Sequence, residues 1–198
     1  MKVLALIALI LLCIGEADAQ KIDTTLRDEV LAMEKVDQDA RRKCTGTADE
    51  QTKCIVEIAE KIDTPHTQRL TQIVATHGFP SRSIVGERAQ RAFMIMLQHV
   101  TDESLRAKLV EPIKLAFERK EIGPMEYANF IDRHLIRTGK RQLYGSGFDM
   151  KDGKMVLSPT EDLSNLDARR KAIGLPPMTE VVKKMKEIYK LEVVIPKS

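Results

Sequence analysis

The stretch that decides the fold is ERAQRAFMIMLQHV, residues 87–100. Its apolar side chains would point in nearly every direction around a helix: Ala89, Ala92, Phe93, Ile95, Met96, Leu97 and Val100. A helix that is apolar on almost all sides belongs in the middle of a helical bundle. The composition agrees, because aromatic residues make up only 4% and Trp is absent. Aliphatic residues and Met must therefore fill the core, which favours helix packing over a sheet rich in aromatic residues.

Helical periodicity continues on both sides of this stretch. The first helix has an apolar stripe of Ile22, Leu26, Val30 and Met33. Pro112 lies inside a later helix and should kink or split it. The sequence predicts helices at about 22–43, 47–62, 64–78, 87–100, 102–121, 124–138, 165–173 and 180–190.

Two helix starts carry specific signals. Thr47 and Glu50 form a capping box, in which each side chain satisfies a free backbone N–H of the second helix. Thr64 and Pro65 predict the start of the third helix, with Thr64 as the N-cap. The second helix should bury the following stripe: Ile55, Ile58, Ala59 and Ile62.

The period changes from helical to alternating at about 148–157. Asp152 and Gly153 suit a two-residue hairpin turn, which would set Met150 opposite Met155 and Phe148 opposite Leu157. One face of this hairpin would be apolar. We therefore expect a mainly α, bundle-like single domain over 20–198 with one small β-hairpin.

The N-terminus resembles a secretory signal peptide over residues 1–19. Lys2 precedes an apolar run from Val3 to Ile14, and Ala17-Asp18-Ala19 has the small residues of a cleavage site before Gln20. A membrane anchor is the alternative, but a span needs about 20 apolar residues. The sequence predicts export to the periplasm or the exterior, with no stable membrane span after cleavage.

Two cysteines remain after this predicted cleavage, Cys44 and Cys54. An even pair in an oxidising compartment predicts a disulfide, and two free thiols are the alternative. The bridge would staple a helical hairpin over residues 20–64. For so short a loop it would stabilise the fold by roughly 2.5–3 kcal/mol.

The charge is mild and interleaved along the chain. The formal net charge is +3, and it becomes +4 without Lys2, Glu16 and Asp18. This pattern is typical of a solvated surface and not of a nucleic-acid-binding face. We expect no nucleic-acid partner, and an unknown protein or small molecule as the ligand.

Standard catalytic signatures are absent from the sequence, including HExxH, GxSxG, Walker and GxGxxG motifs. No metal site and no cofactor are therefore predicted. Polar residues beside apolar ones supply the candidates. His99 could act as acid, base or ligand, Asp132 could orient an imidazole, and Tyr144 could donate a hydrogen bond. The candidates for ligand binding are Arg133, which could hold an anion, and Gln142 and His134.

Each of these residues also has an ordinary structural interpretation. A lone histidine near a helix end, an Asp-Arg pair in a helix and a glycine-rich turn are common in folds without a site. His66 and His77 are weaker candidates, because His77 suits the C-terminal end of its helix. Taken together, the candidates predict a polar pocket.

The order of short motifs resembles a family of bacterial proteins known only as a domain of unknown function. The motifs are GFP at 78–80, VG at 85–86, QH at 98–99, DR at 132–133, QLYGS at 142–146 and RRKAIGL at 169–175. The resemblance covers about residues 65–180 and leaves 20–64 outside it. Phe79 replaces the usual Trp, and Val100-Thr101 replaces Ala-Asp, which removes a carboxylate beside His99 although Asp102 is close. The resemblance implies a shared set at His99, Asp132, Arg133, Gln142 and Tyr144, but no activity.

The sequence thus predicts a binding or interaction protein of the bacterial envelope or exterior. The alternative is a hydrolase-type enzyme in which His99 is the general base in a polar pocket with Asp132 and Tyr144.

Overall fold

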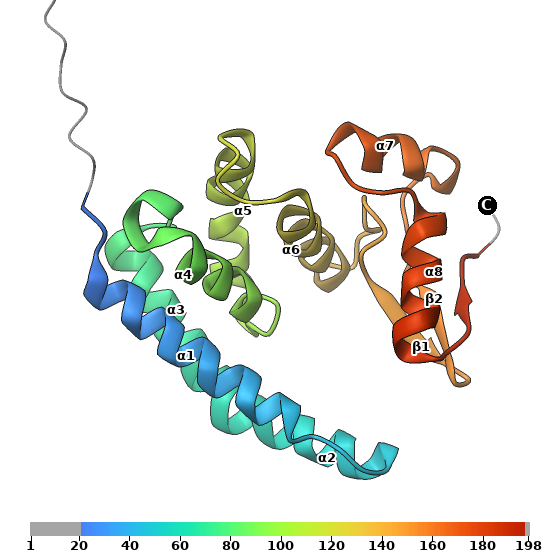
Figure 1. Cartoon of the computed structure of the whole chain (residues 1–198), viewed down its shortest axis with the longest axis horizontal. Helices are drawn as coiled ribbons and strands as arrows, with labels where there is room; N and C mark the ends of the chain where they lie inside the picture. Colours follow the sequence, from blue (N-terminus) through green and yellow to red (C-terminus); the bar gives the residue numbers. More distant parts are fainter. Residues whose placement is uncertain (1–20, 197–198) are drawn as a thin grey trace, which may run out of the picture.

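The computed structural model describes residues 21–196, and the predicted signal peptide lies outside them. The protein is mostly helical with a small three-stranded sheet, as predicted (Figure 1). The helices of the N-terminal body are α1 (Thr24–Arg42), α2 (Ala48–Ile58), α3 (Thr64–His77), α4 (Arg82–Met96), α5 (Glu103–Glu118) and α6 (Pro124–Arg137). The C-terminal part contains β1 (Phe148–Lys151), β2 (Lys154–Leu157), α7 (Leu166–Ala172), α8 (Met178–Tyr189) and β3 (Val193–Val194). Within 21–196, no helix combines the length and apolar character needed to cross a membrane.

Helix α4 lies at the centre of the main core, as its apolar pattern predicted. Ala89, Ala92 and Phe93 are fully buried. The helix begins at Arg82 rather than near 87, because Gly86 adopts φ 79° and ψ 163° and joins two helical pieces across a kink. It ends at Met96 and leaves His99 in a turn.

Helix α1 packs along α4 and begins at an N-cap, Asp23, whose carboxylate accepts the Leu26 N–H. Leu26 and Val30 of its predicted stripe are buried. The buried face of α1 extends beyond these apolar residues, because Glu34 and Asp37 on the same face are buried as well.

The predicted break between the second and third helices was wrong. Thr64 is not an N-cap: a π-helical segment, Ala59–Asp63, carries α2 directly into α3. Both the N–H and the hydroxyl of Thr64 donate to Ala59 O. This wider turn suits Pro65, which has no N–H to donate to the preceding turn. Ile55 is also not buried as predicted, because 44% of it is exposed.

Other local predictions are confirmed. The capping box of Thr47 and Glu50 is present, and Cys44 and Cys54 form a disulfide that joins the end of α1 to α2. The predicted split at Pro112 does not occur, since one helix covers Glu103–Glu118 with Pro112 inside it. Proline removes only one backbone hydrogen bond, and the rest of the helix remains.

The hairpin has the predicted register, with Met150 opposite Met155 and Phe148 opposite Leu157. Its apolar face is only partly covered. Leu157 packs on Leu166 and Met178 in a second, smaller core. Met150, in contrast, is 61% exposed. The short strand β3, which was not predicted, pairs in parallel with β2.

Candidate functional site

Two histidines and two aspartates from three separate helical segments meet beside the end of α4. His66 of α3 and His99 line one small space together with Asp37 of α1 and Asp63 of the π-helical segment. The space between these side chains is too small to hold a water molecule. We call these four residues and Arg41 the histidine cluster.

Arg41 holds the two carboxylates of the histidine cluster in place. Its Nη2 lies 3.0 Å from Asp37 Oδ1 and 2.5 Å from Asp63 Oδ1. The Asp37 side chain is 1% exposed and that of Asp63 is 9% exposed. Gln38 Nε2 donates to the second oxygen of Asp37 at 2.7 Å. Buried carboxylates are tolerated in a protein interior when they are paired and hydrogen-bonded in this way.

The π-helical segment decides where Asp63 and His66 lie. Such one-turn insertions rotate the side chains that follow them and are frequent at functional sites. Asp63 and His66 are three residues apart and so share one face of the chain. That face is directed at the end of α1, where Arg41 binds Asp63.

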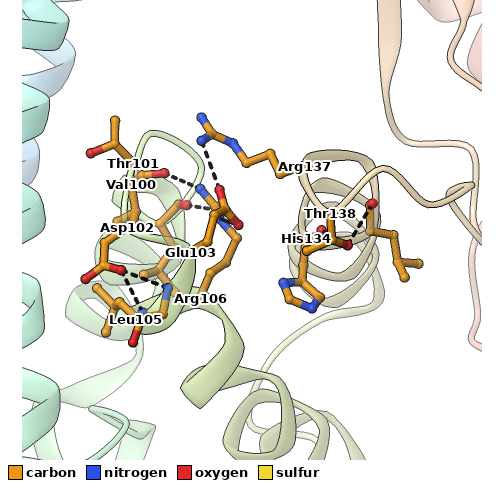
Figure 2. A network of polar contacts seen from close by, with 12 residues as sticks. Val100, Thr101, Asp102, Glu103, Leu105, Arg106, His134, Arg137 and Thr138 are labelled. Carbon is orange, nitrogen blue, oxygen red and sulfur yellow. Dashed lines mark hydrogen bonds and ion pairs between the residues drawn. The ribbon is translucent and has the colours of Figure 1, made fainter.

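Arg106 fixes the turn that carries His99. The Arg106 side chain is fully buried, its Nη1 donates to Leu97 O at 3.0 Å, and its Nη2 donates to Val100 O (Figure 2). Burial, and then the charge of Arg137, lower the pKa of Arg106 to about 10, so it remains a cation at neutral pH. This cation binds the carbonyl end of α4, where a positive charge is favourable.

Both histidines of the cluster are neutral at neutral pH. Burial lowers the pKa of His99, and the charge of Arg41 adds to this, while Asp37 and Asp63 oppose it. Burial also lowers the pKa of His66. The Nδ1 atom of His66 is buried and has no hydrogen-bond partner among residues 21–196. The half-buried His99 side chain forms no hydrogen bond within residues 21–196.

Arg133 and His134 of α6 lie on the other side of this region. The charge of Arg133 acts on the His99 imidazole and lowers its pKa. Arg133 forms no ion pair with any residue in the described part of the chain. Figure 2 shows His134 on the side of α6 that faces α5, and its Nδ1 is buried without a partner. Arg133 therefore acts on His99 through its charge, and within residues 21–196 neither Asp132 nor Tyr144 forms a hydrogen bond with His99.

Asp132 organises a loop. Its carboxylate is fully buried and accepts hydrogen bonds from the backbone N–H groups of Leu143, Tyr144 and Ser146 at 2.8–3.0 Å, and from the Ser146 hydroxyl at 2.8 Å. Among residues 21–196 it forms no hydrogen bond with His99. Four donors occupy the acceptor positions that the predicted imidazole contact would need.

Gln142 is a second anchor of the same loop. Its Nε2 donates to Gly147 O, Ser158 O and Thr160 Oγ1 at 3.0–3.1 Å, and its Oε1 accepts the Gly147 N–H at 2.8 Å. A Cβ on Gly147 would lie 2.7 Å from Ile136 Cδ1, so a larger residue there would require the Ile136 side chain to move. A ligand bound by Gln142, as predicted, would have to share the side-chain amide with these internal hydrogen bonds.

Tyr144 packs in the main core beside Tyr127, with 5.9 Å between ring centroids. Tyr127 stacks on Phe117 at 4.4 Å. Burial, and then the neighbouring Tyr144, raise the pKa of Tyr127 to about 12. Tyr127 is therefore neutral, and the two rings help to close the space between α5, α6 and the loop.

Asp102 does not replace the carboxylate that the sequence lacks beside His99. Its Oδ1 caps α5 by accepting Ser104 N–H at 2.8 Å and Leu105 N–H at 3.2 Å. Asp37 and Asp63 supply the negative charge instead. Sequence reasoning missed both, although Asp37 follows Leu26, Val30 and Met33 at helical spacing and so marked a buried polar position.

No group of three or more His, Cys, Asp or Glu side chains within 21–196 has the arrangement needed to hold a metal ion. The histidine cluster instead places the neutral His99 imidazole beside two carboxylates that Arg41 pairs, and the charge of Arg133, outside the cluster, also acts on it. This arrangement can move a proton or bind an anionic group.

Comparison with known proteins identifies one family. Residues 24–194 match the model of DUF6624, described as a family of unknown function. This range is wider than the motifs at 65–180, and it includes the helical hairpin that we expected to lie outside the resemblance. No curated protein and no solved structure matches the chain. The match covers well over half of the sequence, and the chain therefore belongs to DUF6624.

Proposed function

We propose that this protein is an exported hydrolase-type enzyme in which His99 acts as the general base. The observation that carries this proposal is the state of the His99 side chain: half-buried, neutral and without a hydrogen bond in the described part of the chain. A neutral imidazole with a pKa below its ordinary value can accept a proton at neutral pH.

The surrounding charges suit this role. When His99 takes a proton from water or from a substrate hydroxyl, the negative charges of Asp37 and Asp63 stabilise the imidazolium that forms. Arg41 keeps both carboxylates in position through the ion pairs described above. The closed interior of the cluster leaves no room for a substrate, so reaction would take place at the exposed edge of His99, on the side of Arg133.

Export is part of the proposal and rests on two features. Residues 1–19 have the pattern of a signal peptide, and the Cys44–Cys54 disulfide suits an oxidising compartment. Intact-mass measurement of the protein recovered from the periplasm or the medium should show cleavage before Gln20. A full-length mass in the cytosolic fraction would contradict export.

A second candidate function is ligand binding without turnover, as the sequence first indicated. The space inside the histidine cluster is closed, which favours this function over catalysis. Many enzymes have a water-filled pocket beside the general base. In that case His99 and Arg133 would hold a ligand at the surface.

One set of measurements separates these functions. The exported protein is assayed against chromogenic carboxylic esters, phosphate esters and peptide amides, and native mass spectrometry records any bound molecule. For an enzyme, His99→Asn should abolish turnover while His77→Asn, in the last turn of α3, should not. The rate should also fall on the acidic side as His99 is protonated. Turnover that survives His99→Asn would refute the proposal that His99 is the general base. A bound molecule that is lost only in this variant, with no turnover in the wild type, would favour the binding function.

A further inference from the structure

A second site lies far along the chain from the histidine cluster, in the C-terminal part. A cavity of about 390 Å³ lies between the segment 157–164, Arg141 and Pro196. This volume falls at the small end of the range of about 300–1,000 Å³ that ligand pockets occupy. Leu157, Pro159 and Leu163 give it apolar walls.

Two opposite charges line this cavity without neutralising each other. The exposed Arg141 donates from Nη1 to Thr160 O at 3.2 Å, and its other donors form no hydrogen bond within residues 21–196. The Asp162 carboxylate accepts from Ser164 Oγ at 2.5 Å and from Asn165 Nδ2 at 2.6 Å. These bonds, that of Ser164 first, lower the pKa of Asp162, so it is ionised. Arg141 and Asp162 form no ion pair with each other.

The wall that carries Asp162 is held rigidly in an uncommon conformation. Asp162 has φ 33°, a left-handed value that side chains other than Gly, Asn and Asp rarely adopt. Arg169 maintains it by donating to Asp162 O at 3.0 Å and to Glu161 O. Gln142 holds the neighbouring Ser158 O and Thr160 hydroxyl. Such preorganisation lowers the entropy that a ligand loses on binding.

Ser158 adds a third polar group. The residue is 3% exposed, lines the cavity, and its hydroxyl forms no hydrogen bond within the described residues. A hydroxyl at a cavity wall can both donate and accept, so Ser158 is available to a ligand.

We propose that this cavity binds a small zwitterion, a free amino acid or a dipeptide, with the ligand carboxylate on Arg141 and its ammonium group on Asp162. The guanidinium matches the planar carboxylate, and Asp162 accepts from the ammonium. The apolar walls receive an aliphatic side chain, and Ser158 completes the polar contacts. This site is separate from the histidine cluster, so the inference is independent of the function proposed above.

The test is isothermal titration calorimetry of the mature protein with the common free amino acids and L-alanyl-L-alanine. The tightest binder is then compared with its N-acetyl derivative, which lacks the ammonium group, and its amide, which lacks the carboxylate. Each derivative should bind about tenfold more weakly or worse, because each loses a charged hydrogen-bonded contact.

Two variants test which residue binds each end of the ligand. In Arg141→Gln the amide should bind as well as the free acid, and in Asp162→Asn the N-acetyl derivative should bind as well as the free amine. Asn tolerates the left-handed backbone at 162, so this variant should fold. Arg119→Gln, an exposed change at the end of α5, is the matched control and should leave affinity unchanged.

Three results would overturn the proposal: no binding by any of these ligands, equal binding of the blocked derivatives, or unchanged affinity in both variants. Should Asp162→Asn unfold, the N-acetyl derivative still decides that end of the site. His99→Asn should not change this affinity, which keeps the result separate from the test of the catalytic proposal.

Discussion

Asp132, one of the predicted site residues, has a structural task in the fold. Its two oxygens accept hydrogen bonds from three backbone N–H groups and one hydroxyl in the loop 143–146. Gln142 binds the same loop from the other side. The sequence could place these residues in one segment, but their partners are set by how that segment folds back on α6.

Replacing Asp132 by Ala should lower the free energy of unfolding by about 3–5 kcal/mol, because several backbone N–H groups of the loop would lose their acceptor. Asp149→Ala, on the exposed strand β1, is the control and should change stability little. Denaturant unfolding of the purified protein measures both. A stable Asp132→Ala variant would mean that the loop has other anchors and would reopen a catalytic role for Asp132.

His66 and His99 make stability depend on pH. Burial lowers the pKa of both histidines below 6.5, the ordinary value that they regain in the unfolded chain. Protons therefore bind the unfolded chain first as the pH falls. The stabilisation is complete above about pH 6.5 and decreases as the pH falls through that value toward the lower pKa of the folded protein.

The corresponding experiment compares wild type with His66→Gln/His99→Gln by urea unfolding between about pH 7.5 and 5. Wild type should lose stability over this interval, and the double variant should lose less. If the free energy of unfolding depended on pH in the same way in both proteins, neither imidazole would have a lowered pKa in the folded protein.

At the scale of elements, one cation, Arg106, joins α5 to the end of α4. Arg106 of α5 binds the carbonyls of Leu97 and Val100 and so closes the last turn of α4, while Glu103 lies 3.6 Å from its Nε (Figure 2). Arg137 of α6 joins Glu103 at 3.1 Å and links a third helix to this point. The His99 turn is therefore positioned by helices that follow it in the chain.

Arg106→Met keeps the bulk of the side chain but removes the donors, and it should destabilise the protein by about 3–5 kcal/mol. The NMR signal of the His99 imidazole should also move, because the turn that carries it is released. Arg119→Met, at the exposed end of α5, should do neither. An unchanged His99 signal in a folded Arg106→Met variant would show that Arg106 does not position the turn that carries His99.

Elements with a strong local pattern were predictable from sequence. The stripe of α1, the capping box of Thr47 and Glu50, and the hairpin turn at Asp152-Gly153 are all present. The boundary at Thr64 was not, because a π-helical turn has no clear sequence pattern and lets Pro65 remain inside a continuous helical run. β3 is too short to show an alternating pattern.

At the scale of the whole molecule, Arg170 connects the C-terminal part to the helical body. Its side chain is buried and donates to Pro176 O at 2.7 Å and to Tyr144 O. Tyr144 in turn packs against the main core. α7 is thus joined to the loop that Asp132 holds on α6 (Figure 1).

Arg170→Met should loosen this connection without unfolding the helical body. Hydrogen–deuterium exchange should become faster in 142–178, and it should stay slow in α1 and α4. Lys171→Met, an exposed change one residue along, is the control. Faster exchange throughout the chain would instead indicate that the protein unfolds as one cooperative unit.

The sequence by itself determined the helical character, the register of the hairpin, the cysteine pairing and the family. These depend on spacing within short segments, where side chains a few residues apart must share a face or a turn. Only the tertiary structure decided the histidine cluster and the cavity beside Arg141. Asp37, Asp63, His66 and His99 are brought together by the packing of α1, α3 and α4 and by one π-helical turn. No local pattern encodes that meeting, because it depends on which helix faces are buried against each other.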